Sequence, residues 1–225
     1  MKVFCVIPAF NEEKTVRKIV ERALLYVNEV VVVDDGSDDG TYEEAISGGA
    51  TVIKQEHNCG AGKAIRIGVE KALNANADLI VTLDADGEHD PDDIPRLVHG
   101  VTEKNANIVV GSRFLDQRMH AYKMPILNKI SNKISTSLMN SVFKTHITDS
   151  QSGFRVYTRN VFEQVNCEED KYLYLTEVLI KAIQKGLIVA EIPITSVYRR
   201  DKKLRHSLKE SFQYTALLYR IKHGK

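Results

Sequence analysis

The chain has 225 residues, of which 43% are hydrophobic and 27% charged, and this composition is typical of a soluble globular protein of one or two domains. Its 31 basic and 30 acidic residues leave a net charge of +1, so no overall field favours a nucleic-acid partner. The three cysteines are far apart, which excludes a disulfide framework and favours a reducing cytoplasm. No apolar run approaches the ~18 residues of a membrane span, and the first one is too short for a signal peptide.

Five short apolar runs in the first half predict strands that are buried on both faces, as in a parallel sheet. The runs are Val3–Ile7, Val30–Val33, Thr51–Ile53, Leu79–Leu83 and Ile108–Val110. Helical periodicity lies between them, near Glu12–Tyr26, Thr41–Ile46, Gly62–Leu73 and Asp92–Lys104. This alternation of strands and helices predicts a doubly wound α/β fold.

The second half begins with a basic amphipathic helix. Residues 117–148 contain no Asp or Glu, and an apolar residue recurs at every fourth position from Ile126 to Val142. The favoured interpretation is that this apolar stripe packs on the domain, and the alternative is that the helix lies on anionic lipid. Further on, we expect a helix at Tyr172–Lys185, a strand at Leu187–Ile192 and a helix at Ser207–Lys222. No linker interrupts the pattern, so residues 1–225 are expected to form a single domain.

Acidic and amide side chains follow three of the predicted strands, where ligands of open parallel sheets bind. These segments are residues 8–13, 34–41 and 84–90. In the third, Asp86 and Glu88 are two positions apart, so an extended or turning backbone can aim both carboxylates at one point. Hard oxygen ligands select Mg²⁺ or Mn²⁺. A calcium-binding EF-hand is excluded, because the twelfth position counted from Asp84 is Pro95 rather than Glu.

Other polar segments allow both a functional and a structural interpretation. Residues 58–63 lack the glycine patterns of phosphate-binding loops, so their amides either face an anion or cap a helix. Arg113 follows the fifth strand and either offsets phosphate charge or forms a surface ion pair. Residues 149–155 either line a site or form a turn, and Glu177 is a site residue or a surface charge. Five of the eight residues at 199–206 are basic, which suits a phosphate-bearing acceptor or solvated surface.

Taken in order, these motifs resemble the inverting nucleotide-sugar glycosyltransferases of family 2, and in particular the dolichyl-phosphate mannosyltransferase-like branch. The segments that carry the resemblance are Ile7–Glu13, Val33–Ser37, Asp39–Thr41, Leu83–Asp86, Gly111–Phe114, and Asp149 with Ser152–Arg155. They cover roughly residues 1–200. The resemblance implies a GT-A type Rossmann-like fold with a mostly parallel central sheet flanked by helices, a nucleotide-sugar donor, and Mg²⁺ or Mn²⁺.

The resemblance also implies roles for individual residues. The donor would contact Pro8, Phe10, Glu12, Val33, Asp35, Asp84 and Ala85. The metal ligands would be Asp86 and Glu88, and the catalytic residues Asp86, Arg113 and Arg199. Acceptor-side or site-lining candidates are Asp149, Ser152, Gly153, Glu177 and Arg205. Relatives often carry a Gly-x-Ser-Lys segment shortly after Arg199, and this chain has Asp201-Lys202-Lys203-Leu204 there.

The expected reaction is transfer of a hexose, with GDP-mannose as the favoured donor, to a polyprenyl or dolichyl phosphate. The first half, residues 1–115, would bind donor and metal, and residues 116–225 would face the acceptor and a membrane surface, alone or through a membrane subunit. A lipid phosphate is already anionic and needs no strong base, whereas a hydroxyl acceptor would need Glu177 or Asp149. The alternatives are a UDP-sugar transferase and a non-catalytic nucleotide-binding or membrane-scaffolding module. A nucleotidyltransferase is disfavoured, because the segment after the first strand is acidic.

Overall fold

The computed structural model describes residues 1–116, 124–198 and 208–224. Its strands are β1 (Val3–Ala9), β2 (Glu29–Asp34), β3 (Thr51–Lys54), β4 (Leu79–Thr82), β5 (Ile108–Ser112), β6 (Arg155–Thr158) and β7 (Val189–Pro193). The α-helices are α1 (Val16–Ala23), α2 (Thr41–Ser47), α3 (Ala61–Asn74), α4 (Ile94–Glu103), α5 (Ile126–Phe143), α6 (Arg159–Gln164), α7 (Tyr174–Gln184) and α8 (Leu208–His223). A short 3-10 helix, η1 (Pro91–Asp93), leads into α4.

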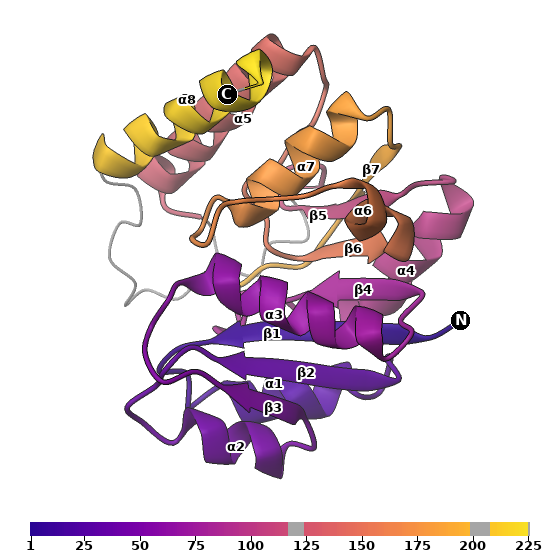
Figure 1. Ribbon diagram of the computed structural model, residues 1–225, viewed down its shortest axis with the longest axis vertical. Coiled ribbons are helices and arrows are strands. Elements are labelled where there is room, and N and C mark those ends of the chain that lie inside the picture. Colours follow the sequence, from indigo (N-terminus) through magenta and orange to yellow (C-terminus); the bar gives the residue numbers. More distant parts are fainter. Residues whose placement is uncertain (117–123, 199–207, 225) are drawn as a thin grey trace.

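The seven strands form one sheet in the order β3-β2-β1-β4-β6-β5-β7 (Figure 1). All neighbouring pairs are parallel except the two that involve β6, which runs antiparallel to both β4 and β5. The sequence-based expectation of a parallel sheet among the first five strands therefore misses an insertion, because β6 separates β4 from β5. Val156 and Tyr157 of this short strand are fully buried.

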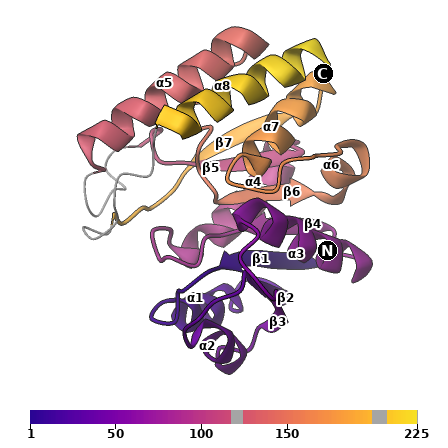
Figure 2. The ribbon, with the colours of Figure 1, turned by 60° about the vertical axis from the view of Figure 1, so that its left-hand side comes forward.

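Strand residues alternate between two hydrophobic cores, one on each face of the sheet. In β1, Cys5 and Ile7 belong to one core, and Phe4 and Val6 to the other. Helices α1, α2 and α4 supply side chains to the first core, and α3, α7 and α8 to the second. Figures 1 and 2 show these helices on opposite faces of the sheet. Burial on both faces explains why the strands read as continuous apolar runs.

Helix α3 lies close against β1 because a glycine occupies the contact. A Cβ atom on Gly68 would come within 2.4 Å of Val6 Cγ1, a distance that the packed strand does not accommodate. The helix begins directly at the carboxyl end of the sheet, after Gly60, which has a φ of 105°. Glycine adopts this conformation without the steric cost that a Cβ imposes. Helix α3 therefore brings its first turn to the edge where ligands of such sheets bind.

Helix α5 is oriented opposite to the favoured sequence-based interpretation. Its buried residues are Asn132, Thr136 and Met139, whereas the isoleucine stripe that begins at Ile126 is exposed. Hydrogen bonds explain this orientation. The Thr136 hydroxyl lies 2.9 Å from Ser150 Oγ, and Asn140 Nδ2 donates to the carbonyl of Ile147 at 2.8 Å. The polar face of α5 thus binds the loop that leads to β6, and the apolar residues Ile126, Ile130 and Ile134 point outward and are exposed.

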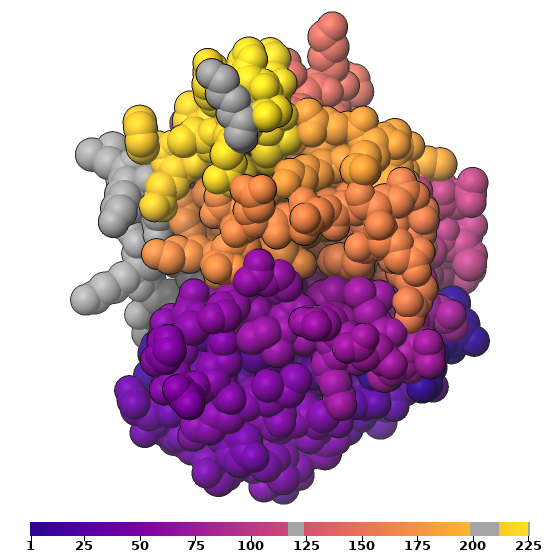
Figure 3. Space-filling model, viewed as in Figure 1, coloured from indigo at the N-terminus to yellow at the C-terminus, as the bar shows by residue number. Residues whose placement is uncertain are grey.

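The two halves of the chain share the sheet, since β1–β5 come from the first half and β6 and β7 from the second. Figure 3 shows one continuous body, with the indigo and purple N-terminal part below and the orange and yellow C-terminal part above. Across the described parts of the chain, no helix has the length and apolar character needed to cross a bilayer.

Candidate active site

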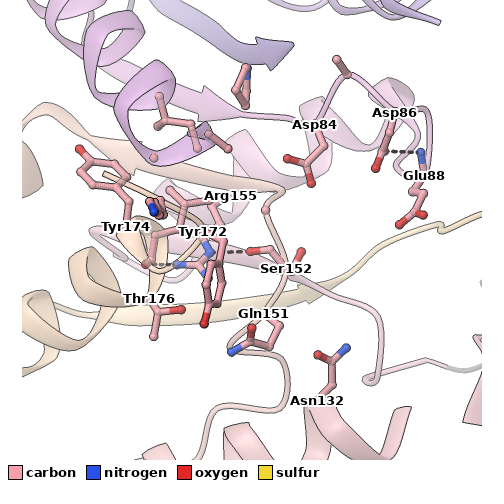
Figure 4. A pocket seen from close by; sticks show the side chains of 18 of the residues that line it. Asp84, Asp86, Glu88, Asn132, Gln151, Ser152, Arg155, Tyr172, Tyr174 and Thr176 are labelled. Atoms are coloured by element: carbon pink, nitrogen blue, oxygen red, sulfur yellow. Dashed lines mark hydrogen bonds between the residues drawn. The ribbon is translucent and has the colours of Figure 1, made fainter. Parts of the chain in front are cut away.

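A cavity of about 450 Å³ lies at the carboxyl edge of the sheet, within the size range of small-molecule sites. Its lining comes from the ends of β1, β4 and β5, the first turn of α3, the start of α5, the loop before β6 and the start of α7. Of the residues expected at the site, the cavity is lined by Pro8, Phe10, Glu12, Asp84, Ala85, Asp86, Glu88, Arg113, Ser152 and Gly153. Figure 4 shows Asp84, Asp86 and Glu88 on one side and Arg155, Gln151 and Asn132 on the other.

The acidic side of the cavity is built by the chain that follows β4. Asp86 is 4% exposed, and its Oδ1 accepts the Glu88 backbone N–H at 2.9 Å, which fixes the turn between the two carboxylates. Behind them lies the His89 ring, with Nε2 4.0 Å from Asp84 Oδ2. Burial, followed by the positive charge of Arg113, lowers the pKa of His89 to about 4, so the ring is neutral at pH 7. His89 therefore does not neutralise the carboxylates beside it.

Gly153 gives Asp84 the room to approach. A Cβ atom on Gly153 would lie 2.6 Å from Asp84 Oδ2 and 3.0 Å from Oδ1, closer than packed atoms come. The Gly153 carbonyl accepts a hydrogen bond from Thr82 Oγ1 at 2.7 Å, which holds the loop before β6 against β4. The absence of a side chain at position 153 thus sets where the Asp84 carboxylate can lie.

Replacing Gly153 with alanine should displace the Asp84 carboxylate while leaving the fold stable, because a carboxylate at the end of a side chain can rotate away. We expect roughly 10-fold or greater loss of catalytic efficiency, since small displacements in a site have effects of this size. Steady-state kinetics measure the loss of catalytic efficiency, and thermal unfolding checks that the fold stays stable. Gly40→Ala is the matched control, because its Cβ would come no closer than 3.4 Å to Glu13. Equal activity of Gly153→Ala and wild type would contradict this role.

Arg113 is held in the cavity wall by a buried ion pair. Its Nε and Nη2 donate to the two oxygens of Asp149 at 2.7 and 2.9 Å, and its Nη1 donates to the Tyr198 hydroxyl at 3.1 Å. Burial raises the pKa of Asp149, but the adjacent guanidinium outweighs it and holds that pKa below its usual range. Asp149 itself does not line the cavity. The structure thus corrects the base-candidate interpretation of Asp149: its carboxylate positions Arg113.

Arg155 is a cavity residue that the sequence analysis did not select. It is 1% exposed, and its guanidinium donates to the backbone carbonyls of Ser152, Leu175 and Ser150 at 2.8, 2.5 and 2.8 Å. Within the part of the chain that the structure describes, no carboxylate is paired with it. Asn132, Gln151 and Tyr172 also line the cavity and were not selected. Arg155 could have been selected from the sequence, because it is the basic residue that ends the motif Ser152–Arg155.

Two residues expected at the donor site, Val33 and Asp35, do not line the cavity. Val33 is fully buried in the hydrophobic core, so it has no surface to offer a ligand. The Asp35 carboxylate is 2% exposed and accepts hydrogen bonds from Gln55 Nε2 and from the backbone N–H groups of Cys59 and Gly60, at 2.5 to 2.8 Å. Neither residue lines the cavity. Asp35 supports the loop before α3 instead, and those two amides therefore bind a carboxylate of the protein itself.

Of the three remaining candidates, Glu177 does not line the cavity, and the other two lie outside the described residues. Glu177 is 1% exposed and is neither a cavity residue nor a surface charge. Its Oε2 accepts the backbone N–H groups of Glu168 and Glu169, and Lys181 Nζ lies 2.7 Å from its Oε1. Arg199 and Arg205, expected to contact phosphate, lie outside the described residues.

A divalent cation fits the acidic side of the cavity. The lining there offers the carboxylates of Asp86 and Glu88, and these hard oxygen donors suit Mg²⁺ or Mn²⁺. Over residues 1–116, 124–198 and 208–224, no group of three or more His, Cys, Asp or Glu side chains is placed to hold a metal. A cation bound by two protein carboxylates keeps positions open for phosphate oxygens.

Comparisons with known proteins bear on this fold and site. The family model described as glycosyl transferase family 2 matches residues 4–165. A UDP-N-acetylglucosamine–dolichyl-phosphate N-acetylglucosaminyltransferase from Methanococcus voltae is 30% identical over 87% of this chain and 86% of its own length. An undecaprenyl-phosphate mannosyltransferase from Micrococcus luteus is 29% identical over 88% of this chain and 85% of its own length. A Mycobacterium tuberculosis glucosyl-3-phosphoglycerate synthase, solved with Mn²⁺, UDP and glucosyl-3-phosphoglycerate, superimposes with a TM-score of 0.74. The superposition covers 99% of this chain and 80% of the synthase chain, at 22% sequence identity. This level of identity establishes the fold alone.

The chain has a mostly parallel sheet with an acidic pocket beyond its carboxyl edge, and it superimposes on the synthase. It is therefore a GT-A type α/β protein. The chain belongs to glycosyl transferase family 2, and it is a glycosyltransferase. Both the resemblance and the fold class predicted from the ordered motifs are thereby confirmed.

Proposed function

We propose that this glycosyltransferase moves a hexose from a nucleotide sugar to a polyprenyl phosphate, with inversion at the anomeric carbon. The observation that carries the proposal is the division of charge in one cavity. Asp84, Asp86 and Glu88 lie on one side, and the buried guanidinium group of Arg155 lies on the other (Figure 4). The acidic side suits a cation with a diphosphate, and the basic side suits an acceptor that is itself an anion. The two named relatives, which act on dolichyl and undecaprenyl phosphate by name, support this acceptor class.

Different residues of the cavity would bind the donor, the metal and the leaving group. Pro8, Phe10 and Glu12 form the wall that would receive the base and ribose, next to Asp84 and Ala85 on the donor side. Asp86 and Glu88 would hold Mg²⁺ or Mn²⁺, which when bound supplies positive charge that neutralises the departing diphosphate. Arg113, fixed by Asp149, adds positive charge on the leaving-group side.

No strong general base is required, because a phosphate oxygen of the acceptor is already negative near neutral pH. This agrees with the state of the two carboxylates that had been considered as bases. Asp149 is paired with Arg113, and Glu177 with Lys181. A single in-line displacement by the acceptor oxygen inverts the anomeric carbon.

For the donor we propose GDP-mannose, in line with the mannosyltransferase-like motifs and the Micrococcus luteus relative. A UDP-sugar is the second candidate, favoured by the Methanococcus voltae relative and by the UDP in the structural neighbour. We place the protein in the cytoplasm, peripheral on the membrane face where a lipid acceptor is presented, either alone or through a membrane subunit.

A panel of GDP- and UDP-sugars tests both substrates at once. Each donor is offered with a polyprenyl phosphate and, separately, with a soluble glycan hydroxyl, in Mg²⁺ and in Mn²⁺. We expect GDP release only with GDP-mannose, polyprenyl phosphate and metal together. UDP release would favour the second donor, and turnover with the hydroxyl acceptor would overturn the acceptor class. Binding of a nucleoside diphosphate without turnover of any donor would favour a non-catalytic nucleotide-binding module.

A further inference from the structure

Glu191 is a carboxylate of β7 that no step of the proposed reaction uses. It is partly buried and pairs in register with Val110 of β5, three residues before Arg113. Its Oε2 accepts the Thr148 backbone N–H at 2.8 Å, and its Oε1 accepts the Thr148 hydroxyl at 2.9 Å and the Asp149 backbone N–H at 3.0 Å. Three donors therefore converge on one carboxylate, next to the counter-ion of Arg113.

The direction of the hydrogen bonds around Thr148 follows from the number of protons available. Because the Thr148 hydroxyl gives its one proton to Glu191, the bond of 2.7 Å between Thr148 Oγ1 and Ser112 Oγ must be donated by Ser112. The Ser112 oxygen in turn accepts the Phe114 backbone N–H at 3.1 Å. One hydrogen-bond chain thus runs from Phe114 through Ser112 and Thr148 to Glu191.

A second hydrogen-bond chain runs from Arg113 itself to the same carboxylate. The Arg113 backbone N–H donates to Asp149 Oδ2 at 3.1 Å, in addition to the two guanidinium bonds, and the Asp149 N–H donates to Glu191. Burial raises the pKa of Glu191 above its ordinary value, although the hydrogen bonds from Thr148 and Asp149 act against it. An ionised carboxylate suits the end of both chains, because its oxygens only accept. Glu191 therefore holds the chain around Arg113 and the counter-ion of its guanidinium.

We propose that Glu191 is a positioning residue for the transfer reaction, because its carboxylate fixes the Arg113 guanidinium at the cavity through Asp149 and Thr148. The role of Arg113 beside the leaving group belongs to the proposed function, on which this positioning rests. Glutamine cannot replace Glu191 here. Either orientation of its amide turns the NH₂ group toward the N–H of Thr148 or of Asp149, and a donor that faces a donor leaves both unpaired.

A double-mutant cycle separates positioning from a purely structural role. The variants are Glu191→Gln, Arg113→Lys and the two combined, and lysine keeps a positive charge but lacks the planar fork that Asp149 holds. We expect Glu191→Gln to lower kcat for diphosphate release roughly 10-fold in the wild-type background, with the KM for the donor nearly unchanged. In the Arg113→Lys background the loss should be less than about 3-fold. Equal losses in the two backgrounds would overturn the proposal, because a structural defect does not depend on which cation occupies position 113.

Two further variants complete the cycle. Thr148→Val removes the hydroxyl chain but keeps both backbone donors on Glu191, and it should lower kcat by about 3-fold. If thermal unfolding shows that Glu191→Gln does not fold, Thr148→Val is carried through the same two backgrounds, and equal losses or no loss would overturn the proposal. Glu29→Gln is the matched control, because Glu29 is also a partly buried strand carboxylate that accepts a threonine hydroxyl, that of Thr51 at 2.9 Å, and it does not line the cavity. Its kcat should equal that of wild type.

Hydrogen exchange at the Arg113 guanidinium tests the same contact without any substrate. In protein with isotope-labelled arginine, the Arg113 Nε–H signal is identified by its absence in Arg113→Lys. We expect this proton to exchange at least about 10-fold faster in Glu191→Gln than in wild type. An unchanged exchange rate would refute the positioning. Absence of diphosphate release by wild type with every donor would instead refute the proposed function and leave the exchange result intact.

Discussion

The Asp86→Asn variant should lose metal-stimulated binding of a nucleoside diphosphate and at least about 100-fold of its turnover. The amide oxygen of asparagine can still accept the Glu88 N–H, so the turn after β4 should keep its shape. What disappears is one of the two charged ligands proposed for the cation. Titration calorimetry of GDP and UDP with and without Mn²⁺ measures the binding, and release of diphosphate measures the turnover.

The control for this experiment is Asp38→Asn, which removes the same charge from the same edge of the sheet. Asp38 follows β2, is exposed and does not line the cavity. We expect its metal-dependent binding and turnover to remain at wild-type level. Undiminished Mn²⁺-stimulated binding in Asp86→Asn would refute the metal assignment, and an equal loss in both variants would show that overall charge, rather than ligation, is responsible.

Asp149→Leu should lower the free energy of unfolding by about 3–5 kcal/mol, because it leaves the Arg113 guanidinium buried without its counter-ion. The double variant Arg113→Met/Asp149→Leu removes both charges and should recover most of that loss, since apolar side chains of similar size can replace a buried ion pair. Urea unfolding measures both variants. Turnover should stay low in the double variant, because Arg113 supplies positive charge at the cavity and methionine does not.

The comparison of stability with turnover separates two roles for this pair. If the double variant regained both, Arg113 would serve only the fold. If neither single nor double substitution changed the unfolding free energy, the buried pair would have no structural role. Glu21→Gln is the matched control, because it breaks the Arg17–Glu21 pair, in which both side chains are about half exposed and screened by water. Its unfolding midpoint should match that of wild type.

Local signals in the sequence were sufficient for the acidic side of the site. Asp84, Asp86 and Glu88 follow an apolar run within a few residues, so their place at the carboxyl edge of the sheet follows from the strand itself. Arg113 was found in the same way after β5. Asp35 satisfied the same rule by position, whereas Val33 was expected at the site only through the family resemblance. Their side chains face the loop before α3 and the hydrophobic core.

The basic side of the cavity could not be derived in this way, because it is assembled from distant segments. Arg155 enters the cavity wall through carbonyls of its own loop and of Leu175 on α7, contacts that no local pattern specifies. From the sequence, Glu177 was interpreted as a surface charge or a general base. Only the tertiary structure shows that it pairs with Lys181 and accepts hydrogen bonds from two backbone amides.

By itself, the sequence determined the alternation of strands and helices, the family to which the chain belongs and the acidic residues of the site, because each of these depends on side chains close together in the chain. The tertiary structure decided the insertion of β6 between β4 and β5, the pairing of Arg113 with Asp149 and the outward orientation of the α5 isoleucines. These features depend on which distant polar groups satisfy one another when buried. Hydrogen bonds that involve Thr136 and Asn140 turn the polar face of α5 inward, so the apolar periodicity predicted the helix but not the direction in which its apolar face points.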